Sequence, residues 1–172
     1  GHSLGGLIVA NYLLEHPEGI DGMVLSSPFL GLKMKVPPLK VLAAKGLSSV
    51  IPTFALPTNI PPEALSTDPA VGVAYMADPL VGKSATARWF TETMKAQETV
   101  LRRASLLRLP ALLLIAGADS IADPEVSQSF LAALGSSDKE LEWYDGMYHE
   151  IFNERENLTV FSALASWLEK RR

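Results

Sequence analysis

The chain has 172 residues, of which 48% are hydrophobic and 20% charged, so it has the size and composition of one globular domain with a substantial core. Because it contains no cysteine, disulfides, thiol nucleophiles and thiolate metal sites are excluded. The net charge of −4 argues against nucleic-acid binding, which needs a basic excess, and no apolar run reaches the ~18 residues of a transmembrane helix.

The chain begins with a predicted helix and a predicted strand. Residues 4–15 carry apolar residues at helical spacing and are followed by His16 and Pro17, which favour a stop. Residues 21–28 form a short apolar run bounded by glycine and proline, which is typical of a buried strand.

A long insertion follows, from residue 29 to residue 109. The turn and helix that connect two parallel strands need only ~10–12 residues, so most of this segment is additional. Its first part is rich in proline, and its second part has a helical pattern at about 84–107. We interpret residues 29–109 as a mainly helical cap, or lid, over one end of a sheet.

The last part of the chain alternates strands and helices again. Strands are expected at about 110–118 and 141–145, and a helix at 124–134 with Asp123 as its N-cap. A final helix is expected at 155–170, with one apolar stripe made of Leu158, Phe161, Leu164, Ala165 and Leu168.

This alternation of helices and strands predicts an α/β fold. Residues 1–28 and 110–172 would form a core of parallel strands with flanking helices, and residues 29–109 the cap. Parallel strands place their carboxyl ends at one edge of the sheet, so that edge is where side chains from distant segments are expected to meet.

The first five residues, Gly-His-Ser-Leu-Gly, fit the pattern G-x-S-x-G directly before a predicted helix. In that pattern the serine sits on a tight strand-to-helix turn, and the glycines two before and two after it let backbone segments pass closely. Ser3 is therefore a candidate nucleophile. The backbone N–H of Leu4, at the start of the helix, is a candidate oxyanion donor.

A nucleophilic serine needs a base and a carboxylate that orients the base. His149 follows the last expected strand and Asp119 follows the one before it, so both should lie at the same sheet edge as Ser3. The chain order Ser3, Asp119, His149 is that of α/β hydrolases. Asp123 is the rival acid, but its place just before Pro124 and a helix is better explained as an N-cap.

The other histidines and the nearby serines are given simpler roles. His2 should support the turn at Ser3, and His16 should lie on the surface at a helix end. Ser26 and Ser27 close a strand and are interpreted as packing or turn residues.

These motifs give the chain a resemblance to the α/β-hydrolase superfamily, and within it to monoacylglycerol lipases and lysophospholipases. The similarity lies in the segments GHSLGG, SSPFLGLKMKVPP, STDPAVGVAYMADPLV, GADSIADPEVSQSF and YDGMYHEIFNE. It implies that Ser3 is the nucleophile, Asp119 the acid and His149 the base of a catalytic triad. It also implies hydrolysis of a single-chain acyl glycerol or lysophospholipid, without cofactor or metal.

Members of this group carry roughly half of their sheet, and a second oxyanion donor, before the nucleophile. We therefore interpret the chain as the C-terminal part of such a hydrolase, beginning at the nucleophile turn. We expect these residues alone to be inactive or insoluble, because one edge of the sheet and one donor would be missing. The cytoplasm or a membrane surface is the expected location.

Residues 22–62 contain no acidic residue but four lysines, Lys33, Lys35, Lys40 and Lys45. Two interpretations stay open. The cap contacts an anionic membrane surface, or its apolar residues pack on one another while its lysines keep it soluble.

Alternatives to lipid ester hydrolysis also stay open. The same framework serves serine peptidases, thioesterases and acyltransferases, and fold alone does not separate them. A truncated hydrolase that only binds a lipid or a partner is the non-enzymatic alternative.

Overall fold

A computed structural model describes residues 1–33, 36–58 and 60–171 of the chain. Its central sheet has three parallel strands in the order β1–β4–β5, with the bounds Met23–Ser26, Ala111–Ala116 and Lys139–Tyr144. The prediction of an α/β fold with a parallel sheet is therefore confirmed. The first strand is shorter than predicted, and β5 begins two residues before the predicted strand.

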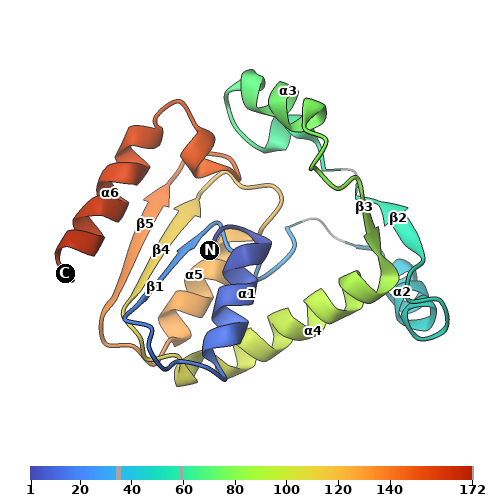
Figure 1. Ribbon diagram of the computed structural model, residues 1–172, viewed down its shortest axis with the longest axis horizontal. Helices are drawn as coiled ribbons and strands as arrows, with labels where there is room; N and C mark the ends of the chain where they lie inside the picture. The colour runs from blue at the N-terminus through green and yellow to red at the C-terminus, as the bar shows by residue number, and fades with distance from the viewer. Residues whose placement is uncertain (34–35, 59, 172) are drawn as a thin grey trace.

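Helices cover both faces of this sheet (Figure 1). One face carries α1 (Leu4–Leu13) and α5 (Pro124–Ala133), and the other carries α6 (Asn157–Glu169). No helix in the described ranges is long and apolar enough to cross a membrane.

The strand β4 explains why the sequence between residues 111 and 116 is uniformly apolar. All six of its residues are buried, because β4 is the central strand and helices pack on both sides. Alternate residues belong to different cores: Ala111, Leu113 and Ile115 face α1 and α5, whereas Leu112, Leu114 and Ala116 face α6.

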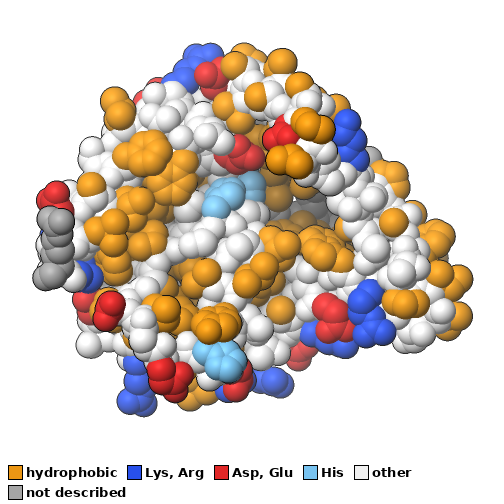
Figure 2. Space-filling model, viewed as in Figure 1, with side chains coloured by type: hydrophobic (Ala, Val, Ile, Leu, Met, Phe, Trp, Pro, Cys, Tyr) orange, Lys and Arg blue, Asp and Glu red, His pale blue; other side chains and the backbone are white. Residues whose placement is uncertain are grey.

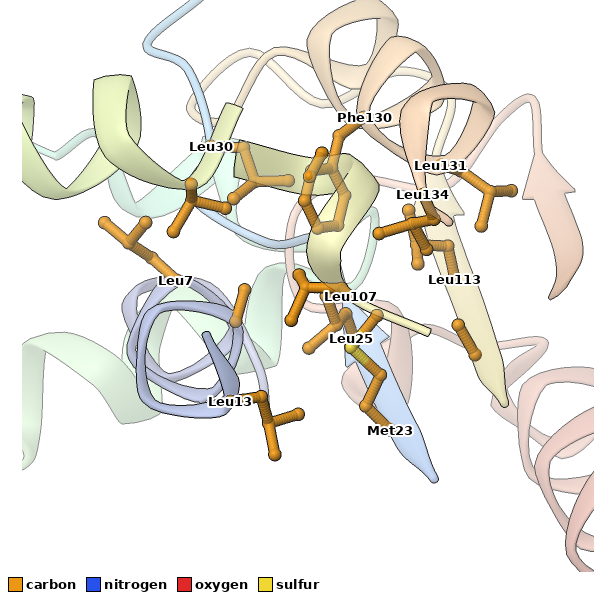
Figure 3. Packing of buried hydrophobic residues seen from close by; sticks show 14 of the residues in the cluster. Leu7, Leu13, Met23, Leu25, Leu30, Leu107, Leu113, Phe130, Leu131 and Leu134 are labelled. Atoms are coloured by element: carbon orange, nitrogen blue, oxygen red, sulfur yellow. The ribbon is translucent and has the colours of Figure 1, made fainter. Parts of the chain in front are cut away.

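The larger core lies between the sheet and the helices α1 and α5. Figure 3 shows Leu7 of α1, Leu25 of β1, Leu113 of β4 and Phe130 of α5 converging there. Each of these side chains is at most 1% exposed. This packing fixes the start of α1, and with it Ser3, against the sheet.

The segment between β1 and β4 contains most of the remaining elements. They are α2 (Pro38–Val50), β2 (Ala55–Pro57), η1 (Pro62–Ala64), α3 (Pro69–Ala77), β3 (Ser84–Thr86), α4 (Ala87–Arg103) and η2 (Ala104–Leu106). In Figure 1, α3 lies beyond the carboxyl ends of the strands, and α2 lies at the end of the molecule away from the sheet.

The predicted helix at 84–107 is wrong at its start. Residues Ser84–Thr86 form β3, which pairs antiparallel with β2. The helix α4 begins at Ala87 because the hydroxyl of Thr86 accepts a hydrogen bond of 3.1 Å from the N–H of Trp89, which caps the helix.

The end of α4 belongs to the packing of the core. Val100, Ala104 and Leu107 are buried in the same cluster as Leu7 and Phe130. The segment 29–109 therefore contributes to the core at its C-terminal end, and its description as a separate cap stays a prediction.

The face that α6 turns to the sheet differs from the predicted stripe. Val160 and Trp167 are buried and Leu164 is partly buried, whereas Leu158 is 75% exposed. Of the predicted stripe, Leu164 is confirmed and the other four residues are exposed, because the contact with β4 and with Ile151 decides which side of the helix is covered.

On α1, too, some of the apolar residues at helical spacing are exposed. Leu7 and Leu13 are buried, but Ile8 and Tyr12 are exposed and line a groove between α1 and α4 together with Trp89.

Replacing Leu113 by alanine tests the central packing. We expect a loss of about 2–5 kcal/mol in the free energy of unfolding, because the surrounding core cannot collapse into the cavity. Leu158→Ala makes the same chemical change at an exposed site and should alter stability by less than about 0.5 kcal/mol. Denaturant unfolding followed by tryptophan fluorescence measures both, and equal effects would contradict the assignment of the core.

Candidate active site

Ser3 lies on a sharp turn between an extended segment and α1. The extended segment runs parallel to β1: the N–H of Ser26 donates to the carbonyl of Gly1 at 2.9 Å, and the N–H of Ser3 donates to the carbonyl of Ser26 at 3.0 Å. Ser3 has φ 50° and ψ −122°, a conformation that non-glycine residues rarely adopt. These two hydrogen bonds with Ser26 hold the strained residue in place.

The close backbone approach predicted at two glycines of the turn is found at one of them. A Cβ at Gly1 would lie 2.5 Å from the carbonyl oxygen of Gly5, so the close approach predicted there is confirmed. A Cβ at Gly5 itself would meet no atom within 4 Å, so the prediction for Gly5 is wrong in the described structure. The second tight position is Gly6 instead, where a Cβ would lie 2.8 Å from the Cβ of Pro28.

Leu4 is the first residue of α1. Its N–H is therefore one of the amides that have no acceptor within the helix, at the positive end of the helix dipole. This placement suits the predicted role of an oxyanion donor beside Ser3.

The structure brings Ser3, His149 and Asp119 together. Nε2 of His149 lies 2.8 Å from Oγ of Ser3, and Nδ1 lies 2.7 Å from Oδ2 of Asp119. His149 is 4% and Asp119 is 5% exposed. The loops that carry them are joined directly, because the N–H of Ala118 donates to the carbonyl of Met147 at 3.1 Å.

The second oxygen of Asp119 fixes its own loop. Oδ1 accepts hydrogen bonds from the N–H groups of Ile121 at 2.8 Å and Ala122 at 3.0 Å. These bonds leave Oδ2 for the imidazole and hold the carboxylate in one orientation.

Asp123, the rival acid, has the structural role predicted for it. Its Oδ1 accepts from the N–H groups of Glu125 at 3.1 Å and Val126 at 3.4 Å, and so caps α5. Its prediction as an N-cap is confirmed.

His2 lies beside His149 rather than in the hydrogen-bonded path from Ser3 to Asp119. Its ring centroid is 5.0 Å from that of His149, and its Nδ1 is 2.8 Å from Oγ of Ser26. Burial, followed by the proximity of His149, lowers the pKa of His2, so its neutral form is favoured.

Ser26 is therefore more than a packing residue, because it holds the ring of His2. Ser27 has φ 39°, its N–H donates to the carbonyl of Leu114, and its buried hydroxyl has no hydrogen-bond partner among the described residues. His16 is exposed after the end of α1, as predicted, with its ring 4.9 Å from that of Tyr12.

One further buried carboxylate lies close to the histidine loop. Oε1 of Glu154 accepts a hydrogen bond of 2.7 Å from the N–H of Tyr148. The N–H of Thr67 lies 3.1 and 3.0 Å from the two carboxylate oxygens, and the hydroxyls of Thr67 and Ser66 donate to Oε2, the latter at 3.0 Å. Burial raises the pKa of Glu154, but these hydrogen bonds outweigh it and hold the pKa below its ordinary value.

The sequence analysis did not single out Glu154. Glu150, Glu154 and Glu156 all follow His149 closely and look alike in the sequence, yet only Glu154 is buried. The one local signal is the apolar pair before it, Ile151 and Phe152, which indicates a buried turn.

The candidate site lies in a hollow. Figure 2 shows histidine side chains at the edge of a depression between the core and the insertion, with hydrophobic side chains around it. Among the residues that the structure describes, no group of three or more His, Cys, Asp or Glu side chains could hold a metal ion.

The four predicted surface lysines do not form one uniform set. Nζ of Lys33 lies 2.6 Å from the carboxylate of Glu125 and 3.7 Å from that of Asp123, so this lysine ties the loop after β1 to α5. Lys45 is exposed on α2. Lys35 and the side chain of Lys40 lie outside the described part of the structure.

Comparison with known proteins agrees with this architecture. By its parallel sheet and by the turn that carries Ser3, the chain is an α/β hydrolase in fold. Residues 1–156 match the family model Hydrolase_4, described as serine aminopeptidase S33, and the chain belongs to that family.

Similar proteins carry lipase and phospholipase names. Phospholipase YtpA of Bacillus subtilis is 31% identical over 172 residues, 99% of this chain and 66% of that protein. The monoacylglycerol lipase of Mycolicibacterium smegmatis is 32% identical over 169 residues, 98% of this chain and 60% of that protein. The chain thus spans less than two thirds of the length of these curated relatives.

A solved structure gives the same similarity in three dimensions. The crystal structure of Paleococcus ferrophilus monoacylglycerol lipase superposes with a TM-score of 0.94 at 34% identity, over 100% of this chain and 67% of that one.

Replacement of Glu154 by glutamine tests the electrostatics of the buried carboxylate. As the pH falls, the unfolded chain, in which this group has its ordinary pKa near 4.5, takes up a proton before the folded chain does. The stabilisation by the ionised carboxylate is therefore complete above that value and is lost as the pH falls toward the lower folded-state pKa. Glu154→Gln should cost about 1–3 kcal/mol at neutral pH, and its difference from wild type should shrink at a pH of about 3.

Denaturant unfolding at the two pH values measures this difference. Glu156→Gln, the same change at an exposed neighbouring site, should alter stability by less than about 0.5 kcal/mol at either pH. A penalty for Glu154→Gln that does not depend on pH would contradict the assignment.

Proposed function

We propose that the chain carries the catalytic machinery of a serine hydrolase that cleaves the carboxylic ester of a single-chain acyl lipid, a monoacylglycerol or a lysophospholipid. The observation that carries the proposal is the hydrogen-bonded path from Oγ of Ser3 through His149 to Asp119, with distances of 2.8 and 2.7 Å. Both distances lie within the range needed for proton transfer to a base that a carboxylate orients.

In the proposed reaction, Oγ of Ser3 attacks the acyl carbonyl carbon while Nε2 of His149 takes the hydroxyl proton. Asp119 holds the proton on Nδ1 and stabilises the imidazolium. The N–H of Leu4 donates to the oxyanion of the tetrahedral intermediate. His149 then protonates the leaving alcohol, and a water molecule that it deprotonates releases the fatty acid from Ser3.

The choice of substrate rests on the similar proteins rather than on the triad. The relatives are named as a phospholipase and as monoacylglycerol lipases, which favours an acyl lipid. The family description, a serine aminopeptidase, favours an amide substrate instead. Relative rates of the whole natural protein on a monoacylglycerol, a lysophospholipid, an aminoacyl amide and an acyl thioester distinguish these classes.

Fluorophosphonate labelling and turnover of the whole natural protein test the triad. Ser3→Ala and His149→Ala should abolish labelling, and Asp119→Asn should lower kcat on the order of 10³–10⁴-fold, because the imidazole loses the group that fixes its tautomer. Asp123→Asn is the matched control and should leave kcat within about twofold, since asparagine also caps helices.

Two outcomes would overturn this proposal. Absence of labelling in the wild-type protein would favour a protein that only binds its lipid or partner. An equal loss of turnover in Asp119→Asn and Asp123→Asn would reject the assignment of the acid.

Contact of the insertion with a lipid surface is part of the proposal. Exposed hydrophobic side chains gather on and just after α2, namely Leu39, Leu42, Val50, Ile51, Phe54 and Leu56. Lys45 lies on the same helix, and no acidic residue occurs between residues 22 and 62. An apolar surface with basic residues suits the interface of an anionic membrane.

Substitution of lysines by glutamine tests this contact. Each lysine near an anionic surface contributes about 1 kcal/mol, so Lys45→Gln should weaken binding to anionic vesicles about fivefold. Lys95→Gln, at an exposed site on α4, should leave binding unchanged. If the variant with all four of Lys33, Lys35, Lys40 and Lys45 replaced binds such vesicles as well as wild type, the membrane contact is wrong.

A further inference from the structure

Glu154 occupies an unusual place for a residue outside the hydrogen-bonded path of Ser3. Only 2% of it is exposed, although it carries a charge. A buried carboxylate is tolerated only where several donors replace its water, and here the donors come from two distant parts of the chain. They are Tyr148, directly before the base, and Ser66 and Thr67, in the insertion.

The backbone on the other side of His149 is held by the same insertion segment. The N–H of Glu150 donates to the carbonyl of Leu65 at 2.7 Å. The loop that carries His149 is thus fixed immediately before and immediately after the base. Through Glu154 and through Leu65, both attachments lead to residues 65–67.

These two attachments affect the distance between the imidazole of His149 and the hydroxyl of Ser3. The 2.8 Å distance from His149 to Ser3 depends on the backbone of residues 148–150, because burial and the hydrogen bond to Asp119 restrict the two side-chain torsions of His149. A misplacement of about 1 Å at a reacting group costs on the order of 10²-fold in rate. A group that fixes this backbone therefore acts on the chemical step without touching substrate.

We propose that Glu154 is a positioning residue, which holds the Tyr148–Glu150 backbone so that His149 reaches Ser3, and that Ser66 and Thr67 make the insertion part of this support. The catalytic consequence rests on the proposed hydrolase function. The expected effect on the position of His149 does not depend on that function.

Kinetics of Glu154→Gln in the whole natural protein give the first test. Glutamine keeps the shape of the side chain but replaces one carboxylate oxygen by an N–H₂ group. At least one of the N–H or hydroxyl donors around residue 154 therefore loses its acceptor. We expect kcat to fall about 10–100-fold with KM within about twofold, and the rate of fluorophosphonate labelling to fall in parallel. Glu156→Gln is the matched control and should leave all three values unchanged.

The imidazole signals give a second test that needs no turnover. In protein with ¹⁵N-labelled histidine, the proton on Nδ1 of His149, which faces Asp119, gives a low-field resonance. Glu154→Gln should shift or broaden this signal and Glu156→Gln should not. A folded Glu154→Gln variant with wild-type kcat and a wild-type resonance would overturn the proposal.

A milder variant keeps the test decisive if Glu154→Gln does not fold. Thr67→Val removes one hydroxyl donor but keeps the N–H of Thr67, so we expect a fall of severalfold in kcat and a smaller change of the imidazole signal. Thr53→Val, at an exposed site of the insertion, should change neither. An unchanged Thr67→Val variant would contradict the role that the proposal gives to the hydroxyl of Thr67.

The two proposals fail in different ways. If the wild-type protein neither turns over nor labels, the hydrolase function is wrong, and the resonance of His149 still decides whether Glu154 positions it. If the wild type labels and Glu154→Gln labels at the same rate, the positioning role alone is wrong.

Discussion

The hydrogen bond between His149 and Ser3 joins two residues that are 146 positions apart, and the rest of the architecture serves to make that contact. It requires three separate strand ends to meet at one edge of the sheet. The parallel sheet provides this edge: Asp119 follows β4, His149 follows β5, and Ser3 follows the extended segment that runs parallel to β1. The apolar core beneath the edge packs α1 against the sheet, and so sets where Ser3 lies relative to the loops that carry Asp119 and His149.

Much of this arrangement could be predicted from the sequence, because its signals are local. The run from Ala111 to Ala116 is apolar at every position, as a central parallel strand must be. Asp123 followed by Pro124 favours a helix start through local chemistry alone. Once the strands were placed, the positions of Ser3, Asp119 and His149 directly after strand ends were enough to predict a common site.

The parts that sequence reasoning missed depend on contacts between distant segments. Glu154 cannot be told from Glu150 or Glu156 until Ser66, 88 positions earlier, is seen to donate to it. The bond between His2 and Ser26 likewise joins two segments through the pairing of the first residues with β1. The exposed face of α6 was misjudged for a related reason. Helical spacing identifies an apolar side, but the sheet determines which residues it covers.

The long separation between Ser3 and His149 along the chain also affects how the protein is made. A ribosome adds about 5–20 residues per second, so His149 emerges some 7–30 s after Ser3. During that interval His149 is not yet present, so the hydroxyl of Ser3 lacks the hydrogen bond to the imidazole. In the proposed mechanism, Ser3 therefore becomes an activated nucleophile only after His149 has been synthesised and has folded against it.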